Sequence, residues 1–273
     1  MKKNKSLLLS TPYILWMLVF TLIPLGVVGY YALTDPDTGA FTLSNLRDIR
    51  LYLPVLGTSV GYALISALIC LLLGYPVAYF IAHQGEVMQK ILYMLVMLPM
   101  CMSFLLRTLA WVGLLETNGI INTLLGWLHI GPVNMIGTPG AVILGMVYNY
   151  LPYMILPLYA IIVKIDHRLI EAAEDLGCNS VKVFTKVVLP LSMPGILSGI
   201  TMVFVPAVST FYISQKLGGT ETMLIGDVIE RQFKSAGNPN LGAALSLVLM
   251  ALVFVCTGIM NRFGSDEEGG VVV

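Results

Sequence analysis

The sequence predicts an all-α membrane protein with six transmembrane helices, and three observations lead to this fold class. Of the 273 residues, 57% are hydrophobic and only 11% are charged, whereas soluble domains carry about 25% charged residues. The mean hydropathy is +0.86. Long stretches without Asp, Glu, Lys or Arg recur along the chain, and about 20 apolar residues let a helix cross the hydrocarbon core.

The six predicted spans follow one another from the amino terminus. They lie within or near residues 6–34, 51–85, 91–115, 141–163, 188–215 and 241–261. Between the third and fourth spans, residues 120–130 would reach only about 16 Å as a helix. We therefore expect that segment to lie at the membrane interface.

The chain is expected to have three parts. Residues 1–52 hold the first span and an outer loop, residues 53–262 form a core with spans two to six, and residues 263–273 are an acidic, small-residue tail that we expect to be disordered. The four cysteines have no spacing typical of a zinc or redox site, so neither a metal site nor a catalytic site is predicted.

The positions of Lys and Arg predict the orientation, because these residues collect in cytoplasmic loops. If the amino terminus lies inside, nine Lys and Arg residues lie inside, five lie outside, and Arg107 lies within a span. Both ends are therefore expected in the cytoplasm, and the protein in the plasma membrane. Lys and Arg equal Asp and Glu at 15 each, so no basic stripe for a nucleic-acid partner is expected.

The longest predicted cytoplasmic loop, residues 164–186, is typical of two short helices joined by a turn. Asp166 is suited to cap the start of the first helix and Gly177 to end it, because glycine readily adopts the left-handed conformation. Asn179 or Ser180 is suited to cap the second. From this pattern alone, the loop is either a docking knob or a solvated connector.

The residues of this loop resemble the EAA motif of ABC-importer permeases, EAA-x3-G-x9-I-x-LP, with Val187 in place of Ile. The matching positions are Glu171, Ala172, Ala173, Gly177, Val187, Leu189 and Pro190. The resemblance implies a type I ABC importer permease fold, in which this loop docks on a separate ATPase. It also implies a second permease, two ATPase subunits and an extracytoplasmic solute-binding protein as partners.

The resemblance further implies that this chain is a transport subunit and not an enzyme. No lysine follows a glycine, so the chain has no P-loop for ATP. ATP and Mg²⁺ are expected on the partner ATPase, and no cofactor is expected in this chain.

Over most of its length the chain is similar to the first permease subunit of spermidine/putrescine importers. The similar segments are 103–107, 141–148, 151–159, the loop 164–186, parts of 218–233, and 242–244. Before the last segment this chain has Asn238-Pro239-Asn240-Leu241, where relatives often carry Trp-Pro-Phe. The resemblance implies import of a polyamine.

A flexible polycation calls for carboxylates and aromatic faces. The candidate substrate-pathway residues are Tyr148, Tyr153, Tyr159, Glu221 and Asp227. Tyrosines near span ends also serve as interfacial anchors, and the acids equally suit docking of the binding protein or exposure to water. Arg107, the one basic residue well inside a span, is expected to have a structural role.

Three alternatives stay open. The chain is a permease for another small solute, or a stand-alone secondary transporter, which would need ionisable residues at mid-membrane. Gly57-Thr58-Ser59-Val60-Gly61 also fits the hydrolase pattern G-x-S-x-G. That pattern needs a strand-to-helix turn, and a membrane helix is predicted here, so close helix packing is favoured for these glycines and for Gly195 and Gly199.

Overall fold

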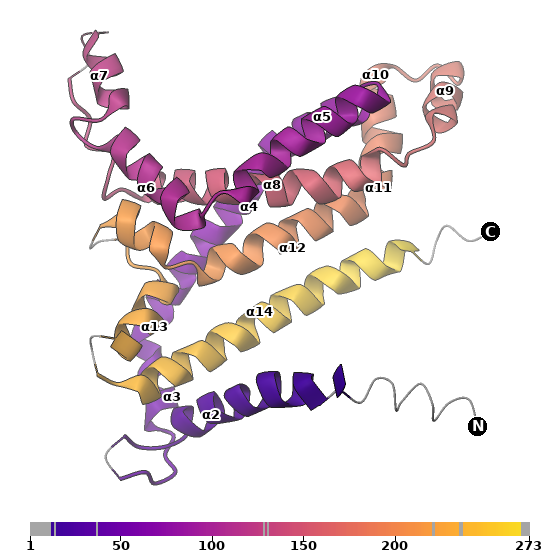
Figure 1. Cartoon of the computed structure of the whole chain (residues 1–273). Helices are drawn as coiled ribbons and strands as arrows, with labels where there is room; N and C mark the ends of the chain where they lie inside the picture. The colour runs from indigo at the N-terminus through magenta and orange to yellow at the C-terminus, as the bar shows by residue number, and fades with distance from the viewer. Residues whose placement is uncertain are drawn as a thin grey trace, which may run out of the picture. The chain divides into compact units, whose positions relative to one another are not determined.

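The structure is a computed structural model that describes residues 12–268, apart from 14, 37, 128, 130, 220–221 and 235–236. The described part is almost entirely helical (Figure 1), and one isolated antiparallel bridge joins Thr34 to Phe41. The chain forms two compact units. The first comprises residues 1–54 and 228–252, and the second comprises residues 55–227 and 253–273.

The first unit is built around buried amide side chains. It holds a π turn η1 (Leu18–Leu22), α2 (Ile23–Ala32), α3 (Ser44–Asp48), the 3₁₀ turn η2 (Ile49–Tyr52), most of α13 (Ile225–Lys234) and the first part of α14 (Pro239–Glu268). Asn45 donates to the carbonyl oxygens of Ala32 and Thr34 at 3.2 and 2.9 Å. Asn240 donates to the same Thr34 oxygen at 2.6 Å. Asn240 therefore ties the start of α14 to the loop after α2.

The second unit holds the remaining helices. In chain order they are α4 (Leu53–Ala82), α5 (Glu86–Met97), η3 (Leu98–Cys101), α6 (Phe104–Leu115), α7 (Ile120–Trp127), α8 (Pro139–Ile162), α9 (His167–Asp175), α10 (Ser180–Val183), η4 (Phe184–Val188), α11 (Leu189–Leu191), α12 (Met193–Ser209) and η5 (Ser214–Gly218).

The core of the second unit lies between α8 and α12. Met154 and Val203 are fully buried there, and two glycines of α12 let the helices approach closely. A Cβ atom at Gly195 would lie 3.1 Å from the Pro157 oxygen, and one at Gly199 would lie 2.6 Å from the Met154 sulfur. Close packing at these two glycines is thereby confirmed.

The described part contains five helices long and apolar enough to cross a membrane, or six if one bent pair is a single span. That pair is residues 180–191 followed by 193–209, bent by 63°. Pro194 explains the bend at Ser192, because proline has no N–H to donate and its ring clashes with the carbonyl four residues earlier. The six-helix prediction is confirmed with the fifth span bent.

The third predicted span differs from expectation. Residues 91–115 form two helices, α5 and α6, and the chain is extended at Met102 (ψ 149°) and Ser103 (ψ 129°) between them. By length and composition, the third candidate span is Phe104–Trp127.

At the other end of the chain, α14 continues to Glu268, past Arg262 into the segment predicted to be a tail.

Candidate coupling and translocation site

Side-chain caps define the starts of both helices in the 164–186 loop. The Asp166 carboxylate accepts a hydrogen bond from the Arg168 N–H at 3.0 Å, where α9 begins. The Asn179 side-chain oxygen accepts one from the Lys182 N–H at 3.0 Å, where α10 begins. The predicted cap at Asp166 is confirmed, and Asn179 rather than Ser180 caps the second helix.

Gly177 forms the turn between the two helices. Its φ is +82°, in the left-handed region that glycine enters without steric cost. The Gly177 N–H donates to the Glu174 carbonyl at 2.8 Å, and the Cys178 N–H donates to the Ala173 carbonyl at 3.0 Å. This pair of bonds is a Schellman motif, so the glycine of the EAA pattern fixes the direction in which the chain leaves α9.

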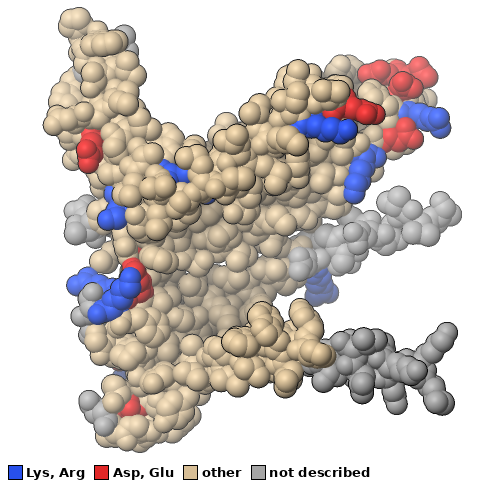
Figure 2. All heavy atoms as spheres, viewed as in Figure 1, with Lys and Arg blue, Asp and Glu red and all other residues tan. Residues whose placement is uncertain are grey.

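The surface of this loop presents both charge and apolar groups. We call residues 164–186 the coupling knob. Glu171 and Ala172 are exposed and Ala173 is half-buried, and Leu176 is 86% exposed. Charged side chains gather over α9 and α10, whereas the long helices of the second unit show few (Figure 2). The small alanines leave room for another surface to approach α9.

The last three motif residues, Val187, Leu189 and Pro190, lie in η4 and α11, which join the knob to α12. Three residues that the sequence pattern missed hold this joint against α4. The Tyr75 hydroxyl and the Ser192 hydroxyl are 2.8 Å apart, and the Phe184 ring meets the Tyr75 ring edge-on at 5.5 Å. No sequence signal pairs Tyr75 with residues more than a hundred positions away.

Aromatic rings of α8 pair with rings on α5 and α6. Tyr148 meets Trp111 with 5.3 Å between ring centroids, and Tyr159 meets Tyr93 at the same separation. The Tyr159 hydroxyl donates to the Gln89 side-chain oxygen at 3.3 Å. The third predicted tyrosine, Tyr153, contacts Tyr150 within α8 at 6.3 Å instead. The predicted tyrosines therefore form separate pairs along one helix.

Arg107 lies one turn into α6 and is only 6% exposed. Among the described residues, its Nε and Nη1 atoms have no hydrogen-bond partner. It lies near enough to Tyr150 to act on it electrostatically, and the Tyr150 hydroxyl donates to the Pro206 carbonyl at 3.3 Å. A cationic group thus sits inside the helix bundle beside α8, where burial of an unpaired charge is costly.

The two predicted acids give different results. Asp227 is 4% exposed, and its carboxylate accepts the Leu224 N–H at 2.9 Å, at the start of α13. It does not face water, which was one of the alternatives. Glu221 lies outside the described residues.

The hydrogen bonds of Ser59 exclude the hypothesis that it is a hydrolase nucleophile. It is fully buried in α4. Its hydroxyl donates to the Val55 carbonyl at 2.8 Å and accepts the Ile225 N–H at 2.7 Å. A serine occupied in this way on a helix, rather than on a strand-to-helix turn, is not a hydrolase nucleophile. No described atom would lie within 4 Å of a Cβ at Gly57 or Gly61, so these two glycines do not mediate close packing within the described chain.

A comparison with known protein families shows which family the chain belongs to. Residues 71–265 match the family described as binding-protein-dependent transport system inner membrane component. The chain belongs to this family. The match includes the coupling knob, α8 and α12, so this permease is a multi-pass protein of the plasma membrane.

Curated relatives match this permease over most of its length. It is 39% identical to the spermidine/putrescine transport system permease protein PotB of Escherichia coli K12, over 86% of this chain and 88% of the relative. It is 39% identical to PotB of Haemophilus influenzae, over 90% and 92% of the two chains. PotB of Salmonella typhimurium LT2 is 40% identical, over 86% and 85%.

Solved structures share the fold of this permease at low sequence identity. A chain of a bacterial ABC transporter that imports the acidic polysaccharide alginate superposes with a TM-score of 0.82, at 18% identity, over 97% of this chain and 96% of that chain. A chain of the MetNI methionine ABC transporter gives 0.62, at 16% identity, over 81% and 98%. The predicted ABC importer permease fold is confirmed.

Proposed function

We propose that this permease carries polyamines into the cell as one of two transmembrane subunits of an ATP-driven importer. The coupling knob supports this proposal most directly, because its capped helices present the EAA residues on an exposed surface at the end of the bent fifth span. In this proposal a separate ATPase subunit, present in two copies, binds ATP and Mg²⁺ and docks on the knob. An extracytoplasmic binding protein delivers the substrate.

The proposed orientation places both chain ends and the coupling knob in the cytoplasm. The distribution of Lys and Arg supports it, with nine on the proposed inner side and five on the outer side. The knob then faces the compartment that contains ATP. Docking at this surface would use Glu171 as a charge, the alanines for close approach, and Leu176 as an exposed apolar contact.

The substrate class is inferred from the relatives and from the aromatic pairs. The three relatives named above are spermidine/putrescine permeases by name. Ammonium groups bind to the faces of aromatic rings, and the rings of Tyr148 and Tyr159, with their partners Trp111 and Tyr93, lie along α8 at positions eleven residues apart. We propose that these pairs contact the polyamine as it passes, with Tyr153 and Glu221 as further candidates.

The contacts of Asp227 indicate a structural role rather than substrate binding. Its carboxylate is committed to the amide of Leu224 and is buried. It therefore shapes the start of α13 rather than offering an open binding group.

Coupling is tested by substituting the knob while the membrane part stays intact. Glu171→Ala and Gly177→Val should abolish uptake by the reconstituted importer and leave basal ATP hydrolysis. Glu174→Ala is the matched control, because it removes an exposed acid from the same helix outside the motif. Unchanged uptake in both motif variants would contradict the coupling assignment.

The substrate is tested through the binding protein. The binding protein that co-purifies with this permease should bind putrescine or spermidine more tightly than unrelated solutes. In the permease, Tyr148→Leu and Tyr159→Leu should raise the KM for polyamine uptake, whereas Phe at either position should keep it close to the starting value, because the ring face is retained. If the binding protein prefers a non-cationic solute, the polyamine assignment is wrong, but the proposed coupling mechanism is unaffected.

A further inference from the structure

A pocket of about 250 Å³ lies at the root of the coupling knob, within the second unit. Its floor is apolar and includes Ile162, Ile165 and Val188, and its polar side includes Gln89 and two histidines, His83 and His167. The pocket therefore joins the end of α4, the end of α8 and the start of α9. None of the contacts described above for coupling or for the aromatic pairs uses the two histidines.

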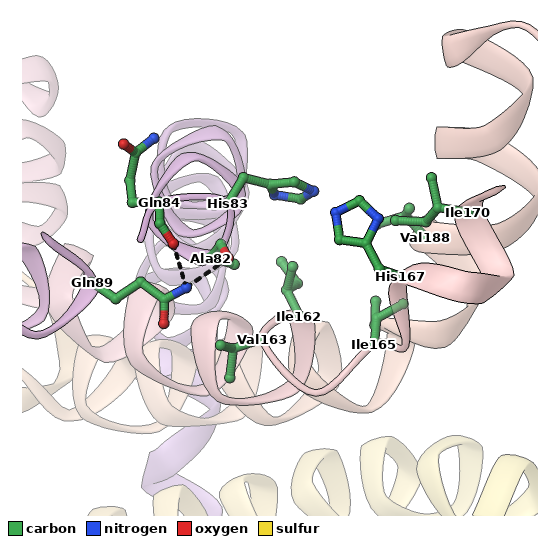
Figure 3. A pocket seen from close by; sticks show the side chains of 10 residues that line it. All are labelled: Ala82, His83, Gln84, Gln89, Ile162, Val163, Ile165, His167, Ile170 and Val188. Carbon is green, nitrogen blue, oxygen red and sulfur yellow. Dashed lines mark hydrogen bonds between the residues drawn. The ribbon is translucent and has the colours of Figure 1, made fainter. Parts of the chain in front are cut away.

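The two imidazole rings face each other across the mouth of the pocket (Figure 3). Their centroids are 6.1 Å apart and their planes are inclined by 76°. Two imidazoles bound to one tetrahedral zinc ion, with Zn–N distances of about 2.0 Å, have centroids about 5 Å apart. Both residues are exposed, so their side chains have room to approach that spacing.

The environment of His83 resembles that of a metal-binding histidine. Its Nδ1 atom is 2.8 Å from the Tyr79 carbonyl oxygen, which can only accept, so Nδ1 carries the proton and Nε2 of the neutral ring carries the lone pair. Histidines that bind metals commonly donate their other ring N–H to a backbone carbonyl in this way. The His83 ring also lies against the Tyr79 ring, with 4.1 Å between their centroids.

We propose that His83 and His167 bind a divalent transition-metal ion of the kind that prefers imidazole, such as Zn²⁺ or Cu²⁺. No group of three or more His, Cys, Asp or Glu side chains suited to a metal occurs among the described residues. Water therefore completes the coordination, and the affinity is well below that of a four-ligand structural site.

A metal at this position would link two elements that coupling needs to move relative to each other. His83 follows the last residue of α4, and His167 is the first residue of α9. An ion bound to both would pin the coupling knob to α4 and slow transport. This consequence rests on the proposed function of the knob, whereas the binding itself does not.

Metal binding is tested by electron paramagnetic resonance of Cu²⁺ added to the assembled importer. The spectrum should show coupling to two imidazole nitrogens. It should lose that pattern in His83→Gln and in His167→Gln, and keep it in His129→Gln, the matched control at the third histidine of the chain. A copper spectrum that is the same in all three variants would overturn the site.

The predicted slowing of transport by the bound metal is tested by measuring uptake into proteoliposomes. The ATPase subunits of these proteoliposomes face the added Zn²⁺. Each variant is compared with its own metal-free rate, which removes any effect of the substitution itself. Zn²⁺ should inhibit the unsubstituted importer and His129→Gln at least several-fold more than His83→Gln or His167→Gln, and a chelator should restore the rate. Copper binding without a matching difference in Zn²⁺ inhibition would overturn the pinning.

Discussion

Gly226 is the position where the structure makes the sharpest prediction about stability. It is the second residue of α13, and its Cα atom lies against the end of α12. A Cβ atom there would lie 2.5 Å from the Thr210 carbonyl oxygen and 2.8 Å from the Ser209 carbonyl oxygen. To restore ordinary contact, the backbone would have to move by about 0.9 Å. Both obstacles are main-chain atoms, so no side-chain rotation relieves them.

The expected cost of Gly226→Ala follows from the bonds that hold this segment. The neighbouring Ile225 N–H donates to Ser59 at 2.7 Å and the Leu224 N–H donates to Asp227 at 2.9 Å, and both bonds are buried. A shift of this size weakens them, at about 1 kcal/mol each, which agrees with the 1–3 kcal/mol typical of overpacking. A loss of about 2 kcal/mol lowers the Tm by roughly 4–8 °C in a chain of this size.

The assay is thermal unfolding of the detergent-solubilised chain, with Gly61→Ala as the control. No described atom would lie within 4 Å of a Cβ at Gly61, and alanine is favoured over glycine inside a helix by about 1 kcal/mol. Gly61→Ala should therefore keep or raise the Tm. Equal Tm values for the two alanine variants would refute the reasoning from close backbone approach.

Three further predictions are tested by thermal unfolding or by hydrogen exchange. Ser59→Ala should lower the free energy of unfolding by about 1–3 kcal/mol, because it leaves the buried Ile225 amide unpaired; an unchanged Tm would contradict this. Arg107→Met should keep or raise the Tm, since two of the buried guanidinium nitrogens of Arg107 have no hydrogen-bond partner among the described residues and replacing a buried charge by a well-packed apolar group is often neutral or stabilising; a fall of several degrees would reveal a stabilising partner. Asn122→Ala should speed hydrogen exchange at the Val133 amide, which donates to the Asn122 side chain at 2.9 Å, without altering exchange in α8; unchanged protection would rule out this anchor.

Much of the fold could be predicted because the bilayer imposes a simple rule on composition. Uncharged stretches locate the long helices within a few residues, as α4 and α8 show. The bend and break in the other spans were harder to predict. Pro76, Pro152 and Pro206 lie inside continuous helices, whereas the chain bends at Ser192, beside Pro194. Proline spacing alone does not distinguish these outcomes, because neighbouring helices decide whether the freed carbonyl finds a partner.

The coupling knob was predictable down to single residues because its determinants are local. Asp166, Gly177 and Asn179 act on backbone groups within a few positions, and such caps can be read from sequence spacing. The tyrosine pairs were less predictable, since Tyr148 and Tyr159 share a helix face but meet different partners from α5 and α6. The anchoring of Ser192 by Tyr75 depends on two segments far apart in sequence, and no local pattern encodes it.

The bend at Ser192 determines how a force on the knob would be transmitted. Residues 180–191 form a short rod, and α12 continues from it at 63°. Because this angle exceeds 45°, the larger component of a pull directed along the rod acts across the axis of α12 rather than along it. The Tyr75–Ser192 contact lies at the corner and would act as a pivot under such a pull. A motor attached to the knob would therefore swing α12 sideways against α8, which opens or closes a path between helices, instead of sliding it through the membrane like a piston.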